Sequence, residues 1–167
     1  KTAIIDKTTK SSVPYSRALI GALILQKKFK KYEDKYIGVM IPTSAGCALA
    51  SLGILMCGKI PVMINYSTGA EANAKYAQEK CGFKTIVASK ALLEKIECPV
   101  MDGMVLIEDI MKGVTTGDKL GAALKTKLPL GMLLNSVHMG EIDDTIAILF
   151  TSGSEKDPKA VQLTHRN

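Results

Sequence analysis

The 22 residues from Ile37 to Gly58 carry no charged side chain, and this run restricts the folds open to the chain. On length alone it could span a bilayer. Pro42 interrupts it, however, and a proline in a helix interior removes a hydrogen bond and kinks the helix. Each half is too short to cross a membrane by itself. We therefore expect a buried strand at Ile37 to Ile41 and a buried helix at about Ala45 to Cys57.

The rest of the chain alternates short apolar runs with helix-forming segments. A β-hairpin is expected first, from Lys1 to Asp6 and Val13 to Tyr15. The later strands are expected at Pro61 to Ile64, Thr85 to Ala88, Met104 to Ile107 and Ile146 to Phe150, and the helices at Arg17 to Lys31, Thr68 to Cys81, Ser89 to Ile96 and Lys119 to Lys127. Strands separated by helices of this length imply parallel pairing through right-handed crossovers. The pattern therefore predicts an α/β fold with a mostly parallel sheet and flanking helices.

Several helix ends carry sequence signals of their own. Ser16 and Ser89 stand where N-caps are expected. Thr68 and Glu71 have the spacing of a capping box, and Gly82 is the expected stop signal of the same helix. Small residues at Gly46, Ala50 and Gly53 would let the helix that contains them approach the sheet closely.

Four lysines gather at the end of the first expected helix, namely Lys27, Lys28, Lys30 and Lys31. Cations at a helix C-terminus are favoured by the helix dipole, so we interpret them first as a solvated helix end that contributes little to folding. The alternative is a docking patch for an acidic carrier protein or an anionic membrane. The sequence alone does not decide between the two.

The chemistry of the chain is concentrated behind its last apolar run. Thr151, Ser152, Gly153 and Ser154 place three hydroxyl groups beside a flexible backbone, and Lys159 follows a proline. Small hydroxyls and free backbone N–H groups form a concave anion site, to which a lysine adds a point charge. We predict a phosphate-binding loop here, and the alternative is a polar turn between two core strands.

The loop is not a P-loop of the pattern G-x-x-x-x-G-K-[ST], although Lys159 lies at the right distance from Gly153. Pro158 occupies the place of the second glycine and has no N–H group to donate. Ala160 occupies the place of the Ser or Thr whose hydroxyl would hold magnesium. A different class of phosphate loop is therefore indicated.

The run Thr-Ser-Gly-Ser, then Pro-Lys, then Val-x-Leu-Thr-His-x-Asn resembles the phosphate-loop signature of the adenylate-forming enzymes. The usual pattern in that superfamily reads Thr-Ser-Gly-Ser/Thr-Thr-Gly-x-Pro-Lys-Gly-Val. Glu155 replaces the threonine here. With glutamate at this position, the loop resembles that of the branch of acyl-[acyl-carrier-protein] synthetases and 2-acylglycerophosphoethanolamine acyltransferases. Lys156 and Ala160 stand where the pattern has glycines.

The resemblance extends over nearly the whole chain. The stretches that carry it are Gly38 to Thr43, Gly58 to Tyr66, Lys84 to Ser89, Ile107 to Ile110, Gly117 to Leu124 and Asp143-Asp144. It implies that residues 1–167 form the N-terminal part of a single adenylation domain that ends just after the phosphate loop, and that the catalytic residues lie beyond position 167. The chain starts at Lys1 without a methionine, which fits a piece of a longer protein. His165 would be a neighbour of the site on this resemblance, and a structural histidine is an equal alternative.

The resemblance also implies a reaction. A fatty acid carboxylate would attack the α-phosphate of ATP, and the acyl group would pass from the adenylate to a phosphopantetheine thiol of acyl carrier protein and then to a lysophospholipid. The residues expected to bind ATP are Thr151, Ser152, Gly153, Ser154, Glu155 and Lys159, with Mg²⁺ sharing the charge. Acyl-CoA synthetase is the alternative enzyme, with CoA as the thiol. A non-catalytic nucleotide-binding or carrier-docking module is the alternative outside enzymes.

Composition excludes other classes. The net charge of +6 is compatible with nucleic acid, but three Phe, five Tyr and no Trp do not supply the interleaved aromatics of a single-strand binder. The spacing of Cys47, Cys57, Cys81 and Cys98 matches no zinc or thioredoxin motif, so we expect no protein metal site. Small buried thiols of this kind fit a reducing compartment such as the cytosol. Association with the inner face of the membrane, through the rest of the chain, is a further expectation.

Overall fold

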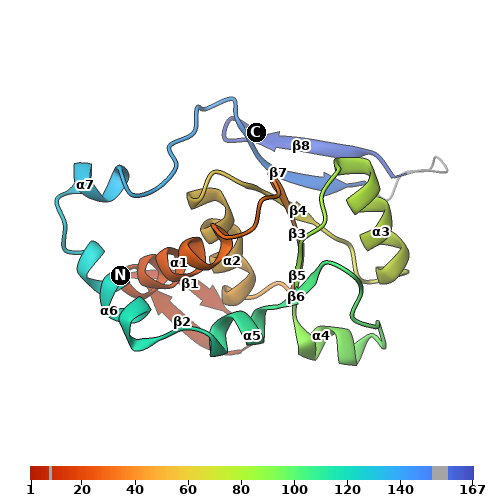
Figure 1. Ribbon diagram of the computed structural model, residues 1–167, viewed down its shortest axis with the longest axis horizontal. Helices are drawn as coiled ribbons and strands as arrows, with labels where there is room; N and C mark the ends of the chain where they lie inside the picture. Colours follow the sequence, from red (N-terminus) through yellow and green to blue (C-terminus); the bar gives the residue numbers. More distant parts are fainter. Residues whose placement is uncertain (8, 152–157) are drawn as a thin grey trace.

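The computed structural model describes residues 1–7, 9–151 and 158–167. Two sheets and the helices around them make up this part of the chain (Figure 1). The strands are β1 (Thr2–Asp6), β2 (Ser11–Pro14), β3 (Tyr36–Met40), β4 (Ile60–Met63), β5 (Ile86–Ala88), β6 (Met104–Leu106), β7 (Thr145–Phe150) and β8 (Ala160–Thr164). The helices are α1 (Tyr15–Phe29), α2 (Ala45–Met56), α3 (Ala70–Cys81), α4 (Lys90–Lys95), α5 (Ile107–Lys112), α6 (Thr116–Lys125) and α7 (Leu130–Leu134).

The larger sheet has the order β6-β5-β3-β4-β7-β8 among the described residues. The pairs β3–β4, β3–β5, β5–β6 and β4–β7 are parallel, and β7–β8 is antiparallel. The predicted α/β fold with a mostly parallel sheet is therefore confirmed. The strands β4 and β5 lie on opposite sides of β3, so the strand order reverses at β3. In open α/β sheets with such a reversal, ligands bind in crevices at the carboxyl ends of the strands.

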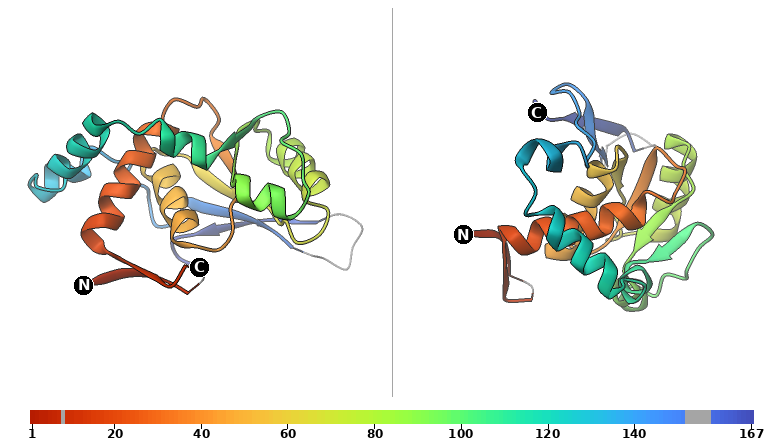
Figure 2. Two further views of the ribbon diagram at one scale, coloured as in Figure 1. Left: turned by 90° about the horizontal axis from the view of Figure 1, so that it is seen from below. Right: turned by 60° about the vertical axis from the view of Figure 1, so that its left-hand side comes forward.

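Helices cover both faces of this sheet (Figures 1 and 2). Ile37, Val39 and Ile41 pack on one face, in a core cluster with Phe29 of α1 and Ile54 of α2. On the other face, Met40 and its neighbours pack with α3 and α4. That second cluster includes Val62, Ile64, Ala74, Ala77, Ile86, Ala88, Leu92 and Leu93. Burial on both faces explains why Ile37 to Ile41 is continuously apolar.

The charge-free run divides as expected into β3 and α2, and Ser44 caps α2 by accepting a hydrogen bond from Cys47 N. Gly53 has a different role from the one predicted. A Cβ atom at Gly53 would lie 2.8 Å from Leu25 Cβ, so this glycine lets α2 approach α1 and not the sheet. Among the described residues, no helix has the length and apolar character needed to cross a membrane.

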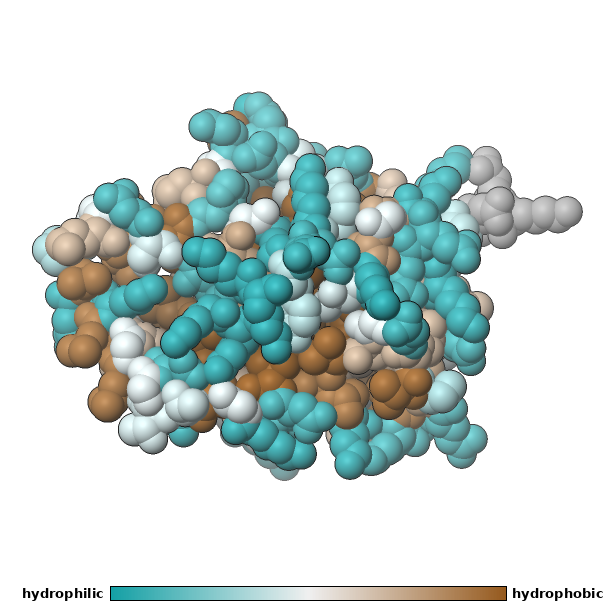
Figure 3. Space-filling model, viewed as in Figure 1, coloured by the Kyte–Doolittle hydropathy of each residue, from teal (hydrophilic) through white to brown (hydrophobic). Residues whose placement is uncertain are grey.

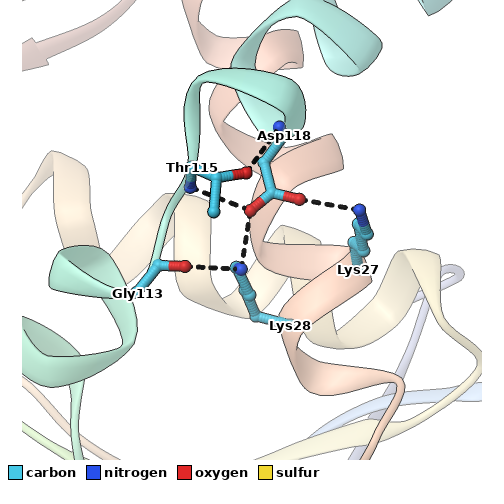
Figure 4. A network of polar contacts seen from close by, with 5 residues as sticks. All are labelled: Lys27, Lys28, Gly113, Thr115 and Asp118. Atoms are coloured by element: carbon cyan, nitrogen blue, oxygen red, sulfur yellow. Dashed lines mark hydrogen bonds and ion pairs between the residues drawn. The ribbon is translucent and has the colours of Figure 1, made fainter.

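The lysines at the end of α1 correct another prediction (Figure 4). Lys27 Nζ and Lys28 Nζ each lie 2.7 Å from a carboxylate oxygen of Asp118 in α6, and Lys28 also donates to Gly113 O at 2.8 Å. The Asp118 side chain is only 4% exposed. These hydrogen bonds hold the pKa of Asp118 well below its usual range. Lys27 and Lys28 therefore join α1 to α6. The solvated-end interpretation was wrong for Lys28, whose side chain is 21% exposed, whereas the Lys27 side chain is 70% exposed.

Several ends and short elements also differ from expectation. The first helix begins at Tyr15 with Pro14 as N-cap, so Ser16 lies inside it and not at its cap. The capping box of α6 is formed by Thr115 and Asp118, which starts this helix at Thr116 and not at Lys119. The short helices α5 and α7 were not predicted. Cys47 is buried while the other three cysteines are half-buried, and burial raises the pKa of all four thiols.

Candidate functional site: a loop at the carboxyl end of the sheet

The predicted phosphate loop connects β7 to β8 at the carboxyl end of β7. Four of its predicted residues, Ser152, Gly153, Ser154 and Glu155, lie outside the described residues. The two others, Thr151 and Lys159, are described and exposed. Because β7 pairs in parallel with β4, the loop opens at the edge of the sheet where the carboxyl ends of the parallel strands meet.

Thr151 and Lys159 close the base of this loop. The Thr151 N–H donates to Lys159 O at 3.1 Å, and the Lys159 N–H donates to Thr151 Oγ1 at 3.3 Å. The structure thus brings together the first and the last of the predicted site residues. The Thr151 hydroxyl accepts this bond through oxygen, and its own proton can still be donated to an anion.

Helix α3 supports the base of the loop from the side (Figure 1). Tyr76 Oη donates to Pro158 O at 2.8 Å. The Tyr76 ring meets Phe150 edge-on, with 5.8 Å between ring centroids and 69° between planes. One side chain therefore holds both the end of β7 and the residue before Lys159. Tyr76 was not predicted as a site residue, because its only signal in the sequence is an aromatic residue among the buried alanines of an otherwise polar helix.

The turn after β4 is tied together next to the site, because β4 is the neighbour of β7. Asn65 Oδ1 accepts from Ser67 N at 2.9 Å and from Ser67 Oγ at 2.6 Å. Asn73 Nδ2 donates to Asn65 O and to Thr68 O, at 2.9 and 2.7 Å. Two asparagines thus fix the path of the backbone into α3.

The capping box predicted at Thr68 and Glu71 is absent. The N-cap is Gly69, which has φ +62° and makes no side-chain cap. Glu71 instead binds Lys75 at 2.7 Å, and this pair raises the pKa of Lys75. The left-handed Gly69 moves the helix start by one residue, so Thr68 is too early to cap it. Gly82 ends the helix in the left-handed conformation, as predicted.

His165 lies far from the loop. It follows β8, which runs antiparallel to β7, so about 17 Å of strand separates it from the loop end at Ala160. It lines a cavity of about 590 Å³ at the amino ends of the parallel strands, together with His138, Lys35, Lys59 and Asp144. The described residues therefore do not bring His165 to the loop. They also contain no cluster of three or more His, Cys, Asp or Glu side chains that could hold a metal ion.

The family of this chain can be recognised over most of its length. A sequence model of the family described as AMP-binding enzyme matches residues 15–167. The chain belongs to the AMP-binding enzyme family.

Curated relatives of the chain include proteins named as fatty-acid–CoA ligases. The chain is 28% identical over 162 residues to long-chain-fatty-acid–CoA ligase 1 of Cavia porcellus. The match covers 89% of this chain and 23% of that protein. It is also 28% identical over 135 residues to a medium/long-chain-fatty-acid–CoA ligase of Mycobacterium tuberculosis. That match covers 77% of this chain and 20% of the ligase. The chain thus spans about a quarter or less of the length of these relatives.

Several solved structures share the fold of this chain. The N-terminal subdomain of Klebsiella oxytoca NpsA, in complex with 3-hydroxybenzoyl-AMSN, matches with a TM-score of 0.70 and 17% identity, over 99% of this chain and 37% of that one. O-succinylbenzoate CoA synthetase of Bacillus subtilis, in complex with AMP, matches with a TM-score of 0.67 and 14% identity, over 92% and 36%. At these identities the likeness concerns the fold alone.

Proposed function

We propose that residues 1–167 are the N-terminal part of a single adenylation domain that activates a fatty acid with ATP. The carboxylate of the fatty acid attacks the α-phosphate, which forms an acyl adenylate and releases pyrophosphate. The proposal rests on membership of the AMP-binding family together with relatives that are named as fatty-acid ligases. The catalytic groups that orient the nucleotide and the acyl chain are expected beyond residue 167.

In this proposal the β7–β8 loop holds the departing pyrophosphate. Thr151, Ser152, Gly153, Ser154 and Glu155 form the loop with Lys159 at its end. The observation that supports it most is the closure of the loop base, since Thr151 and Lys159 bind each other at the carboxyl edge of the sheet and Tyr76 fixes Pro158 between them. A fixed base keeps the lysine near the developing negative charge without reorganisation. Mg²⁺ bound with ATP would neutralise part of the same charge.

The thiol that accepts the acyl group has two candidates. The sequence of the loop, with Glu155 after Ser154, favours the phosphopantetheine of acyl carrier protein and onward transfer to a lysophospholipid. The relatives named as CoA ligases favour CoA at least as strongly. Thioester formation by the complete natural chain, measured with CoA and with holo-acyl carrier protein at equal concentrations, separates these two acceptors.

The loop assignment is tested by Lys159→Ala in the complete natural chain. We expect the rate of fatty-acid-dependent pyrophosphate release to fall about a hundredfold, the scale of losing one preorganised electrostatic contact in a transition state. The unfolding midpoint should change little, because Lys159 is exposed.

Lys35→Ala is the matched control, since Lys35 is an exposed lysine at the opposite edge of the sheet. Equal rates for wild type and Lys159→Ala at saturating ATP would refute the loop assignment. A complete chain that binds ATP and releases no pyrophosphate with any fatty acid would instead support the non-catalytic module.

A further inference from the structure

Exposed apolar side chains are concentrated in one short part of the molecule. Fifteen large hydrophobic residues are exposed among the described residues, and eight of them fall between positions 120 and 142. The eight are Leu120, Leu124, Leu128, Leu130, Met132, Leu134, Met139 and Ile142. Scattered exposed apolar residues are ordinary, but a concentration of them marks an interaction surface. Apolar atoms gather at the left end of Figure 3, over α6 and α7.

The structure holds this end with its apolar side outward. The inner side of α6 is fixed by Ala122, which packs with Leu23 and Ile24 of α1, and by Asp118, which binds the two lysines of α1. Leu120 and Leu124 lie one turn apart and are 60% and 69% exposed. No residue of α7 is buried. We call the exposed residues from Lys119 to Met132 the α6–α7 surface.

Positive charge is concentrated in the segment that carries this surface and in the N-terminal segment that contains α1, which α6 contacts. Residues 1–31 and 113–140 together contain eleven Lys or Arg and two Asp, whereas the remaining residues contain eleven Lys or Arg and fourteen Asp or Glu. Both aspartates of the first group, Asp6 and Asp118, are buried. Between positions 119 and 140 the charged residues are Lys119, Lys125 and Lys127, all exposed, with no Asp or Glu.

We propose that the α6–α7 surface docks the protein on the surface of an anionic phospholipid bilayer. Leucine and methionine side chains would enter the boundary between headgroups and acyl chains, while Lys119, Lys125 and Lys127 face anionic headgroups. A protein partner fits this surface less well. Protein interfaces are enriched in aromatic residues and Arg and depleted in Lys, whereas residues 113–140 contain no Phe, Tyr, Trp or Arg.

Vesicle flotation of the complete natural chain tests the docking without ATP or fatty acid, so its result is independent of the adenylation proposal. The probes are vesicles of phosphatidylglycerol and phosphatidylcholine in equal parts, and vesicles of phosphatidylcholine alone. We expect binding to the anionic vesicles that weakens as salt rises. The double variant Leu120→Ser/Leu124→Ser should lower the partition coefficient about tenfold or more. Lys125→Gln/Lys127→Gln should lower it about fivefold per lysine at low salt.

Matched variants come from exposed residues elsewhere. Val100→Ser/Met111→Ser removes two exposed apolar side chains, and Lys80→Gln/Lys95→Gln removes two exposed lysines, each outside the α6–α7 surface. Both controls should bind vesicles like wild type. The proposal is overturned if the wild-type protein does not bind anionic vesicles, or if the control variants lose as much vesicle binding as the test variants. It is also overturned if light scattering shows that the wild-type protein is a dimer and that Leu120→Ser/Leu124→Ser is a monomer. A third contrary result is a lysine variant that binds vesicles like wild type but no longer binds an acidic carrier protein.

Discussion

The central strands β3, β4 and β5 and the β7–β8 hairpin belong to one sheet but differ in burial. Residues 37–40 of β3 and all of β5 are buried, and helices cover them on both faces. In β7 one residue of six is buried and Leu149 is exposed, and in β8 none is buried. The candidate site lies on the less buried side, where the chain turns back at the end of β7.

This difference separates the residues that determine stability from those available for chemistry. A residue in β3 or β5 contacts helices on two sides, so its size and shape are constrained. The hairpin leaves Thr151 and Lys159 exposed, and it depends on a few specific contacts, chiefly those of Tyr76, to fix the loop base. Loops positioned by a rigid scaffold are where binding residues are usually found.

The largest expected effect tests the burial contrast directly. Ile37 is fully buried, so Ile37→Ala should lower the free energy of unfolding by about 2–5 kcal/mol. Leu149 is 39% exposed, so Leu149→Ala should change it by under about 1 kcal/mol. Urea unfolding measures both values. Ile37→Val, which removes a single methyl group, should cost about 0.5–1.5 kcal/mol and serves as the conservative control. Similar losses from the two alanine variants would remove the contrast.

Two acidic residues extend this comparison to the pH dependence of the free energy of unfolding. Asp34 stands before β3 and accepts hydrogen bonds from Thr85 N at 2.9 Å and Lys84 N at 3.2 Å, as well as from the Thr85 hydroxyl. Burial opposes its charge, but these hydrogen bonds prevail and lower the pKa of Asp34 below 3.8. Asp34→Asn should therefore destabilise the protein at pH 7 by about 1–3 kcal/mol, since an amide cannot accept from all these donors.

The pH dependence has a definite sign. A carboxyl group whose pKa is lower in the folded state contributes stability above its unfolded value, and this contribution is lost as pH falls through the folded value. The difference between wild type and Asp34→Asn should thus be largest at pH 7 and shrink below about pH 4. Asp143 is the control at the hairpin end: Arg166 lowers its pKa too, but the pair is exposed, so Asp143→Asn should leave the urea midpoint unchanged at either pH. A constant difference for Asp34→Asn down to pH 3 would contradict the assignment.

The fold was more predictable from sequence than the site. The charge-free run with Pro42 inside it was sufficient to predict β3 and α2, because a buried parallel strand and a short apolar helix leave few alternatives. Gly82 ended α3 and Ser89 capped α4 as predicted, since local signals decide helix ends when no distant residue competes. The phosphate loop could be recognised only as a motif, and four of its residues lie outside the described part of the chain.

Several of the misses share one physical cause, which is contact between residues far apart in sequence. Lys28 was expected at a solvated helix end, but it binds Asp118, which lies 90 residues later in the sequence. Gly53 was predicted to let α2 approach the sheet, but Leu25 of α1 lies against it. Short helices such as α5 and α7 are similarly weak in local signal, because helices of five or six residues depend on tertiary packing.

The smallest expected effect concerns the contact that joins the well-buried half of the sheet to the loop. Tyr76→Phe removes the hydrogen bond to Pro158 O and keeps the ring contact with Phe150. The free energy of unfolding should fall by about 0.5–1.5 kcal/mol, the net value of one hydrogen bond. In the complete natural chain, kcat/KM for ATP should fall severalfold, because the backbone next to Lys159 loses its support. Tyr36→Phe is the matched control, since Tyr36 begins β3 at the amino ends of the parallel strands, the end opposite to the loop, and it should leave kcat/KM for ATP unchanged. If Tyr76→Phe lowered stability and left kcat/KM for ATP at the wild-type value, the tyrosine would serve only the packing of α3, and the loop base would be positioned by Thr151 and Lys159 alone.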